Sequence, residues 1–387
     1  MTAANDLKKS LVALDQDSTL IGVIELSQKS WLVGGMVPGV AREPLKKLAA
    51  DEAALLKLLH RWREEAIRAG RPITRIAVAF EAGRDGVWLA RWLRKRGIEA
   101  YVIHPTSVTV SREHRRAKTD RLDVALLKRA FLGWLRGEPG HCRMAAIPTL
   151  EMADARRPNR ERQSLGEEKT RIVNQLKSAL AWLGVRSFNP LLRKAPERLA
   201  AVRTPDGEPI PPNTQDELLR MMARLHLIKQ QIKALETARQ ERLETAPDSG
   251  PHAMVRLLAR LKGIAIDTAD TLVHEVLARE LRDDRAVARY AGLTGSPDES
   301  GKRRREKGLA RAGNARVRRC MLQLAWRFLM FQPDSALAQW YHTRTKDAGK
   351  GARKTMVVAL ARKLLIALWR YVRTGVAPEG VILRADA

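Results

Sequence analysis

The sequence contains little cysteine and few aromatic residues. Its 387 residues include two cysteines, Cys142 and Cys320, and phenylalanine, tryptophan and tyrosine together make up 5% of the chain. The two thiols have no CxxC spacing and no neighbouring histidine pairs, which argues against a disulfide framework and against a zinc site. We expect both cysteines to be ordinary buried side chains.

The sequence also lacks long apolar runs. No stretch approaches the roughly 20 apolar residues that cross a bilayer, and the N-terminus does not resemble a signal peptide. The first 18 residues are polar and show no sustained period, so we interpret 1–18 as a loosely ordered leader. These absences predict a soluble, cytoplasmic protein without a membrane partner.

Negative charge is scarce relative to positive charge. Lysine and arginine number 71 against 43 aspartates and glutamates, which gives a formal net charge of +28. Such an excess destabilises a compact chain by self-repulsion unless a polyanion is the working partner, and nucleic acid is the favoured candidate. A chain of this length predicts two or three domains.

Predicted strands and helices alternate through 19–147. Apolar, β-branched runs predict strands, and apolar residues at helical spacing predict helices between them. The strands are expected at 19–26, 30–37, 75–83 and 100–105, and the helices at 43–69, 86–96 and 120–132. This order predicts an α/β sheet with functional groups at the ends of its strands.

Four carboxylates occupy special places in this pattern. Glu25 and Glu81 each lie near the end of a predicted strand, and Asp120 and Asp123 lie on one face of the first turn of a predicted helix. An acid at a buried strand end costs free energy unless it is paired or binds a metal, so two in one sheet indicate a shared site. Salt bridges for the glutamates and helix capping for the aspartates are the structural alternatives.

Together the four acids have the donor chemistry of a divalent metal site. Carboxylates on such a framework can hold two Mg²⁺ ions roughly 3.5–4 Å apart at a phosphodiester, as in ribonuclease-H-like nucleases. The basic stretch just before the helix includes Arg115, Arg116 and Lys118. These side chains could hold the phosphate backbone of a nucleic acid, and a solvated basic loop is the alternative.

The middle of the chain, 148–251, is expected to be helical. Periodic apolar residues predict helices at 167–183 and 214–245, joined by a proline-rich linker near 205–212. Two long amphipathic helices with charged outer faces favour a coiled coil and a homo-oligomer. An intramolecular helical spacer is the alternative.

The last predicted domain, 252–387, contains two candidate nucleic-acid contacts. A helix, a tight turn at Lys262 and Gly263, and a second helix could contact phosphate, although any αα-hairpin looks similar. Further on, Ser296 and Ser300 precede a basic cluster consisting of Lys302, Arg303, Arg304 and Arg305. This stretch is either a flexible loop that grips phosphate or an exposed serine nucleophile supported by arginines.

Several motifs, in this order, resemble the insertion-sequence transposases that have a DEDD catalytic domain. They are FEA at 80–82, AKTDRLD at 117–123, the glycine turn at Gly263, the GL…SG loop at 292–301 and AGN at 312–314. The resemblance implies a RuvC-like domain at 19–147 and a C-terminal transposase domain, guided by a structured bridge RNA. It also implies a bacterial protein that associates with the nucleoid when active.

Carried over by position, the resemblance implies roles for individual residues. Glu25, Glu81, Asp120 and Asp123 would bind Mg²⁺, and Ser300 would be the nucleophile, with Ser296 as the fallback. The family's first acid is usually aspartate, whereas this chain has glutamate at position 25.

We therefore expect a Mg²⁺-dependent, RNA-guided DNA transposase or recombinase that acts as a dimer or tetramer. It would excise and insert a mobile element by serine attack on a DNA phosphodiester, acting on the element's ends and on target DNA. A RuvC-like structure-selective endonuclease that uses the four acids alone is the first alternative. A non-catalytic nucleic-acid-binding scaffold is the second.

Overall fold

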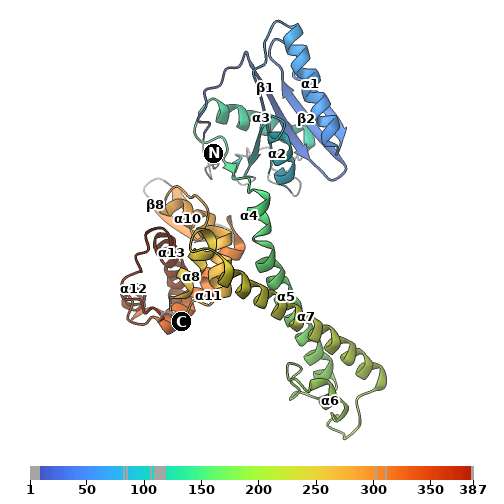
Figure 1. Cartoon of the computed structure of the whole chain (residues 1–387), viewed down its shortest axis with the longest axis vertical. Helices are drawn as coiled ribbons and strands as arrows, with labels where there is room; N and C mark the ends of the chain where they lie inside the picture. The colour runs from blue at the N-terminus through green and yellow to red at the C-terminus, as the bar shows by residue number, and fades with distance from the viewer. Residues whose placement is uncertain are drawn as a thin grey trace. The chain divides into compact units, whose positions relative to one another are not determined.

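The computed structural model describes residues 9–81, 83, 86–104, 107–108, 119–300, 303–309 and 312–384, and for 296–300 and 303–307 it describes the backbone alone. The chain divides into two compact units. The first consists of Met1–Glu151 and Glu280–Gly313, and the second of Met152–Arg279 and Asn314–Ala387. Figure 1 shows the chain coloured from blue at its N-terminus to red at its C-terminus.

A mixed six-stranded sheet forms the first part of unit 1. Its strands follow the order β3-β2-β1-β4-β5-β6, with β1, β4 and β5 parallel and the others antiparallel to their neighbours. The strands are β1 Thr19–Leu26, β2 Ser30–Met36, β3 Leu45–Ala49, β4 Arg75–Glu81, β5 Glu99–Ile103 and β6 Met144–Ala145. This mixed α/β arrangement confirms the predicted sheet and is consistent with a ribonuclease-H-like domain.

Helices cover both faces of the sheet. Helices α1 (Glu52–Arg68) and α2 (Gly86–Arg94) pack on the face that includes Leu20 and Ile24 of β1. Helix α3 (Asp120–Leu135) packs on the opposite face, against Ile21 and Val23 of the same strand. Because side chains alternate along a strand, odd-numbered positions of β1 point toward α3.

Two glycines in β2 allow the helices on opposite faces to approach the sheet closely. A Cβ atom on Gly34 would lie 2.6 Å from Val124 of α3, and one on Gly35 would lie 2.7 Å from the ring of Trp62 of α1. Neither distance is possible in a packed core, so any side chain here would displace a helix. The register pairs Gly34 with Val23, which puts the first turns of α3 over the second half of β1.

One predicted element is wrong at its start. The sequence predicts a single helix over 43–69, whereas the structure has strand β3 at Leu45–Ala49 followed by α1. The helix begins only after Asp51, whose carboxylate accepts hydrogen bonds from the amides of Ala53 and Ala54. The five preceding residues pair with β2 instead, because edge pairing satisfies their backbone groups.

Unit 1 also contains helix α10 (Asp284–Tyr290) and a two-stranded hairpin, β7 (Gly295–Ser300) and β8 (Arg303–Leu309). We call the hairpin 295–309 the serine hairpin. The sequence predicts a loop here rather than strands, because the segment is charged and has no alternation of apolar and polar residues.

In unit 2, the long helices α5 (Arg157–Trp182) and α7 (Pro212–Thr245) lie side by side, as Figure 1 shows in green and yellow-green. They are antiparallel, because Arg239 near the end of α7 donates to Asn159 at the start of α5. Their contact buries Leu176 and Leu225, and the short helix α6 (Ala195–Ala200) closes the far end. The structure therefore shows a pair formed within one chain.

The remaining helices complete unit 2 and confirm the predicted helical C-terminal region. They are α4 (Leu150–Asp154, which begins in unit 1), α8 (Gly250–Ala259), α9 (Ile266–Leu272), the π-helix η3 (Val273–Leu277), α11 (Ala315–Phe331), α12 (Ala336–Thr345) and α13 (Lys350–Thr374). Phe328 and Leu364 are among their fully buried side chains. No helix in the described part of the chain is long and apolar enough to cross a membrane.

Candidate catalytic site

The two predicted strand-end acids lie on neighbouring strands. Ile24 of β1 pairs with Phe80 of the parallel strand β4, so the next residues, Glu25 and Glu81, are side by side at the carboxyl ends of both strands. Both positions are odd-numbered, like the residues that face α3. Both side chains are half-buried. The sheet therefore places these two glutamates on one face and at one end.

Helix α3 brings the two aspartates to the same face. Thr119 is its N-cap and accepts a hydrogen bond from the amide of Leu122 at 3.4 Å. Because Thr119 makes the capping hydrogen bond, neither aspartate is needed for that role. Asp120 is exposed and Asp123 is half-buried, and the next residue, Val124, is buried against the sheet.

We call Glu25, Glu81, Asp120 and Asp123 the acidic set. By strand parity the two glutamates face α3, and the two aspartates lie in the first turn of that helix. Carboxylate oxygens are the ligands that hard divalent cations prefer. In the described residues, no three or more His, Cys, Asp or Glu side chains are already arranged to hold a metal ion. The donor chemistry of the four side chains is that of a divalent-metal site.

The opposite end of the sheet shows how a structural acid is held in this domain. Arg75 at the start of β4 makes two hydrogen bonds to Glu99 at the start of β5, at 3.0 and 2.8 Å, and Tyr101 donates to the same carboxylate at 2.6 Å. Burial alone would raise the pKa of Glu99, but these donors lower it overall. Burial and the Glu99 carboxylate raise the pKa of Tyr101 to about 12.

The candidate nucleophile lies in the serine hairpin. Ser300 is the last residue of β7 and pairs with Arg303, the first residue of β8. Ser296 lies near the base of the hairpin, where the register shifts between Gly295 and Pro297. The register thus puts Ser300 at the end of β7 and Ser296 beside a bulge.

The candidate nucleic-acid contacts are described to different extents. Lys262 is exposed, but its amide donates to Ile382 and its carbonyl accepts from Gln332. Gly263 is buried, with its α-carbon face against Phe331. A phosphate contact at this turn would therefore rest on the Lys262 side chain. Arg303, Arg304 and Arg305 lie on β8, while Arg115, Arg116, Lys118 and Lys302 lie outside the described residues.

Comparison with known proteins places these sites in a family. A model of the transposase IS116/IS110/IS902 family matches residues 255–359, and a model of the DEDD transposases of IS110 matches 42–183. The protein y4rJ of Sinorhizobium fredii, which bears the name of a transposase, is 40% identical over 396 residues, covering 99% of this chain and 100% of the relative. The chain belongs to the IS116/IS110/IS902 family of transposases.

Membership of this transposase family supports DNA as a partner, strand cleavage and rejoining as the coarse activity, and a divalent metal for the DEDD domain. The DEDD match contains Glu81, Asp120 and Asp123 but begins after Glu25. The second match contains Ser300 and the glycine turn. Three of the four acids and the serine thus lie inside the two family domains.

One group of buried, paired charges in this transposase could not be recognised from the sequence. Glu275, inside the π-helix η3, is 1% exposed, and Arg160 of α5 makes two hydrogen bonds to it. Nearby, the buried Asp270 pairs with Arg239 of α7 at 3.1 Å and with His274 at 3.2 Å. Arg160 and Glu275 are 115 positions apart, so no local spacing could have predicted their pairing.

Proposed function

We propose that this transposase excises and inserts its mobile element by serine attack on DNA, supported by Mg²⁺ and directed by a guide RNA. The observation that supports the proposal is the register that puts Glu25 and Glu81 side by side on adjacent parallel strands, together with Asp120 and Asp123 in the first turn of α3, the helix that packs on the face of the sheet opposite α1 and α2. Because Thr119 caps α3, neither Asp120 nor Asp123 is needed as the helix cap. The match to the family's transposase domain includes Ser300, the last residue of strand β7.

In the proposed reaction, the Ser300 hydroxyl attacks a DNA phosphorus. A serine–phosphate ester forms as the bond from phosphorus to the leaving deoxyribose oxygen breaks. The serine hydroxyl loses its proton, and the leaving oxygen gains one. A hydroxyl of the second DNA end then attacks the ester and releases the serine, so rejoining needs no ATP. When bound by the acidic set, Mg²⁺ would supply Lewis-acid stabilisation of charge on the phosphate oxygens.

A guide RNA and the strongly basic chain form the second part of the proposal. With a net charge of +28, the protein has an excess of lysine and arginine side chains that could bind the phosphates of both an RNA and a DNA. In this scheme base pairing to the RNA selects the DNA, while Arg115, Arg116, Lys118, Lys262, Lys302, Arg303, Arg304 and Arg305 contact phosphates without reading sequence. Removal of these charges should weaken binding to all DNA sequences alike.

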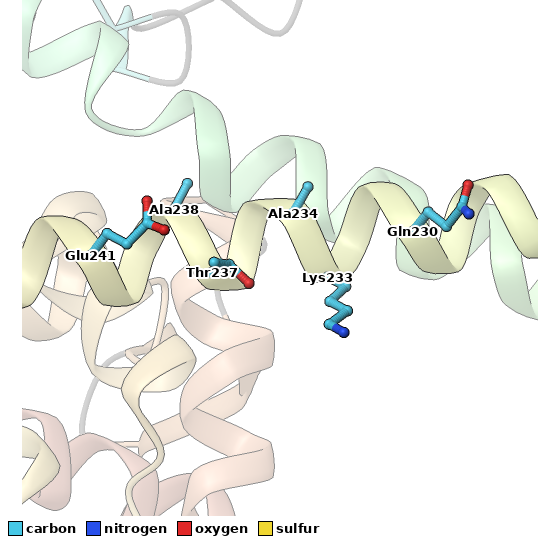
Figure 2. Close-up of a pocket in the computed structure, with 6 residues that line it drawn as sticks. All are labelled: Gln230, Lys233, Ala234, Thr237, Ala238 and Glu241. Carbon is cyan, nitrogen blue, oxygen red and sulfur yellow. The ribbon is translucent and has the colours of Figure 1, made fainter.

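Oligomerisation through the long helices is the third part. A shallow groove follows one exposed length of α7, and Figure 2 shows the six side chains that line it. They repeat every three to four residues, as in a coiled coil, and those in the middle are small. They are Gln230, Lys233, Ala234, Thr237, Ala238 and Glu241. This spacing favours a helix of a second copy, in a dimer or tetramer.

The test uses the full chain with its co-purifying RNA, Mg²⁺ and DNA that carries the element's end. We expect a covalent protein–DNA adduct on a denaturing gel, and we expect Ser300→Ala to abolish it. Ser296→Ala is the matched control, because this serine is in the same strand, and it should retain the adduct. Ribonuclease treatment before the DNA is added should also prevent the adduct.

Other results would support the alternatives. DNA cutting that needs Asp123 but gives no adduct would indicate a RuvC-like endonuclease. An adduct that persists in Ser300→Ala and disappears in Ser296→Ala would move the nucleophile to Ser296. Binding without any cutting, unchanged by Asp123→Ala, would indicate a nucleic-acid-binding scaffold.

A further inference from the structure

The end of α12 and the first half of α13, both in unit 2, carry a large excess of positive charge. Over residues 340–373 the sequence contains nine lysines and arginines and a single acid, Asp347. Six of the nine have exposed side chains on the last turn of α12, in the linker 346–349 or in the first half of α13. They are Arg344, Lys346, Lys350, Arg353, Lys354 and Lys363. We call these six the α12–α13 basic surface.

The opposite side of the two helices is packed and apolar. Tyr341 and Thr345 of α12 are 5% exposed, and Leu360 and Leu364 of α13 are fully buried. The helices contact each other, and only residues 346–349 join them. The six cations therefore extend from two packed helices or from the short linker between them.

The fold does not use these cations in internal ion pairs. Elsewhere in unit 2, arginines of the long helices pair with buried acids, as Arg239 does with Asp270 and Arg160 does with Glu275. Among the residues that the structure describes, no member of the α12–α13 basic surface forms a salt bridge with an acid. Within that part of the chain, their charge is therefore not neutralised.

Helix stability does not explain where these cations lie. Lys350, Arg353 and Lys354 are near the start of α13, and the first turn of this helix contains no acid. The helix dipole favours acids at the N-terminal end and cations at the C-terminal end, so these three side chains are unfavourable for α13. An anion from outside the chain would offset this unfavourable interaction.

Two of the cations gather on one aromatic ring. The Arg344 Cζ atom lies 5.4 Å and the Lys363 Nζ atom lies 4.9 Å from the centroid of the Trp340 ring. The ring attracts both cations and orders them, but it also brings two like charges together. Because cations already lie over this ring, the surface suits contact with phosphates better than stacking of a base.

We propose that the α12–α13 basic surface binds the phosphate backbone of duplex DNA. The inference depends on DNA as a partner, which membership of the transposase family supports, and on neither the serine nor the guide RNA of the proposed function. Duplex DNA presents a dense, regular array of phosphates, whereas unpaired RNA bases are commonly held by open aromatic side chains. Lysine and arginine contacts to phosphate position a duplex without reading its sequence.

The test measures how tightly the full chain, purified with its RNA, binds a short duplex of random sequence that lacks the element's end. The triple variant Lys350→Gln, Arg353→Gln, Lys354→Gln removes three cations of the surface. We expect its affinity to fall by roughly tenfold or more at about 0.1 M salt. The slope of log affinity against log salt concentration should fall by about 0.9 for each phosphate contact that is lost.

A second triple variant, Arg171→Gln, Lys177→Gln, Arg224→Gln, is the matched control. It lowers the net charge of the same unit by the same amount, at exposed positions of α5 and α7. Its affinity for the duplex and its salt slope should stay close to those of the unchanged protein. An equal loss of affinity in both triple variants would indicate a general effect of net charge and would overturn the proposal.

A charge-preserving variant separates loss of charge from loss of structure. Lys350→Arg with Arg353→Lys keeps both cations and should bind the duplex like the unchanged protein. The glutamine variant of the surface should unfold at the same temperature as the unchanged protein or slightly above it, because it removes cations that oppose the dipole of α13. A clearly lower unfolding temperature would show that these side chains are structural and would contradict the proposal.

The RNA content of each preparation shows whether the surface serves RNA instead. We expect equal RNA content in the unchanged protein and in all variants. RNA loss in the surface variant, with duplex affinity unchanged, would assign the surface to RNA and overturn the proposal. If no RNA co-purifies with the unchanged protein, the guide-RNA part of the proposed function fails, while the duplex measurements still decide whether this surface binds DNA.

Discussion

Two groups of carboxylates in this transposase differ in how deeply they are buried. Asp270 and Glu275 of unit 2 are 6% and 1% exposed, and each is paired with an arginine from a long helix. In the acidic set of unit 1, Glu25, Glu81 and Asp123 are half-buried and Asp120 is exposed.

This difference separates two uses of the same functional group. A fully buried carboxylate must be neutralised by fixed partners, so it contributes to a single packed arrangement. A carboxylate that remains accessible to solvent can exchange water for a metal ion or a phosphate-bound metal. Deep burial beside a fixed arginine therefore marks Asp270 and Glu275 as structural acids.

The largest expected effect comes from removing an acid of unit 1. Asp123→Ala should reduce DNA cleavage by on the order of 10³-fold, because a lost metal ligand costs several kcal/mol of transition-state stabilisation. Unfolding free energy should fall by no more than about 1 kcal/mol, the size of a lost first-turn charge. Cleavage kinetics and chemical denaturation of the same preparation check both parts. A variant that unfolds readily would mean that Asp123 is structural.

The converse result is expected in unit 2. Asp270→Ala leaves Arg239, whose side chain is 5% exposed, buried without its acid. Breaking a buried pair in this way costs about 3 kcal/mol or more, so the unfolding transition should move to lower denaturant concentration. Cleavage at a temperature where the variant remains folded should be largely retained. A drop in cleavage as large as that of Asp123→Ala would remove the contrast between the two groups.

Acid should affect the buried group in a predictable direction. Although burial opposes it, hydrogen bonds and charges from His274, Arg239 and Asn159 lower the pKa of Asp270 in the folded state, and Glu275 is shifted the same way. A lowered folded-state pKa stabilises the fold above the unfolded value, near 4, and this stabilisation is lost as pH falls through the folded pKa. Thermal unfolding should therefore occur at lower temperature at pH 3 than at pH 5. Glu275→Gln should show a smaller change across this range.

The smallest effect concerns the two thiols, of which Cys142 is buried, as predicted, and Cys320 is half-buried. Burial raises the pKa of Cys142 in unit 1 and of Cys320 in unit 2 to about 12. Few thiolates then exist at pH 8, so alkylation of the folded protein by iodoacetamide should be much slower than in denaturant. Mass spectrometry of each cysteine peptide checks this. Rapid labelling of one cysteine alone would show that its unit opens locally.

Alternation and capping rules made much of unit 1 predictable. The apolar runs that lead to Glu25 and Glu81 define β1 and β4. Because side chains alternate between the two faces of a strand, the parallel pairing of β1 with β4 puts both acids on the α3 face. Thr119 ahead of Asp120 is an ordinary helix start. What the pattern could not show is whether the acids approach closely enough to bind a metal, because that depends on packing between distant segments.

Elements that depend on long-range pairing escaped prediction. Strand β3 forms because β2 offers it a partner, although its own residues suit a helix equally well. The serine hairpin is defined by cross-strand register rather than by apolar alternation. Glu275 looks like any acid in an amphipathic helix, and only the fold reveals that Arg160 and Asn314 converge on it.

The antiparallel pairing of α5 and α7 forms a helical hairpin whose length depends only on the number of residues in the two helices. The chain travels outward along α5 and returns along α7, so both helices meet the rest of unit 2 at one end, where Asn159 contacts Arg239. Deleting seven residues from each helix would keep side chains close to their original face, with a rotation of about 20°. It would also bring the far tip inward by about 10 Å, since each residue adds about 1.5 Å. The length of α5 and α7 in this transposase thus sets the distance from the base of the pair to its tip, and this distance can change while the contacts at the base stay the same.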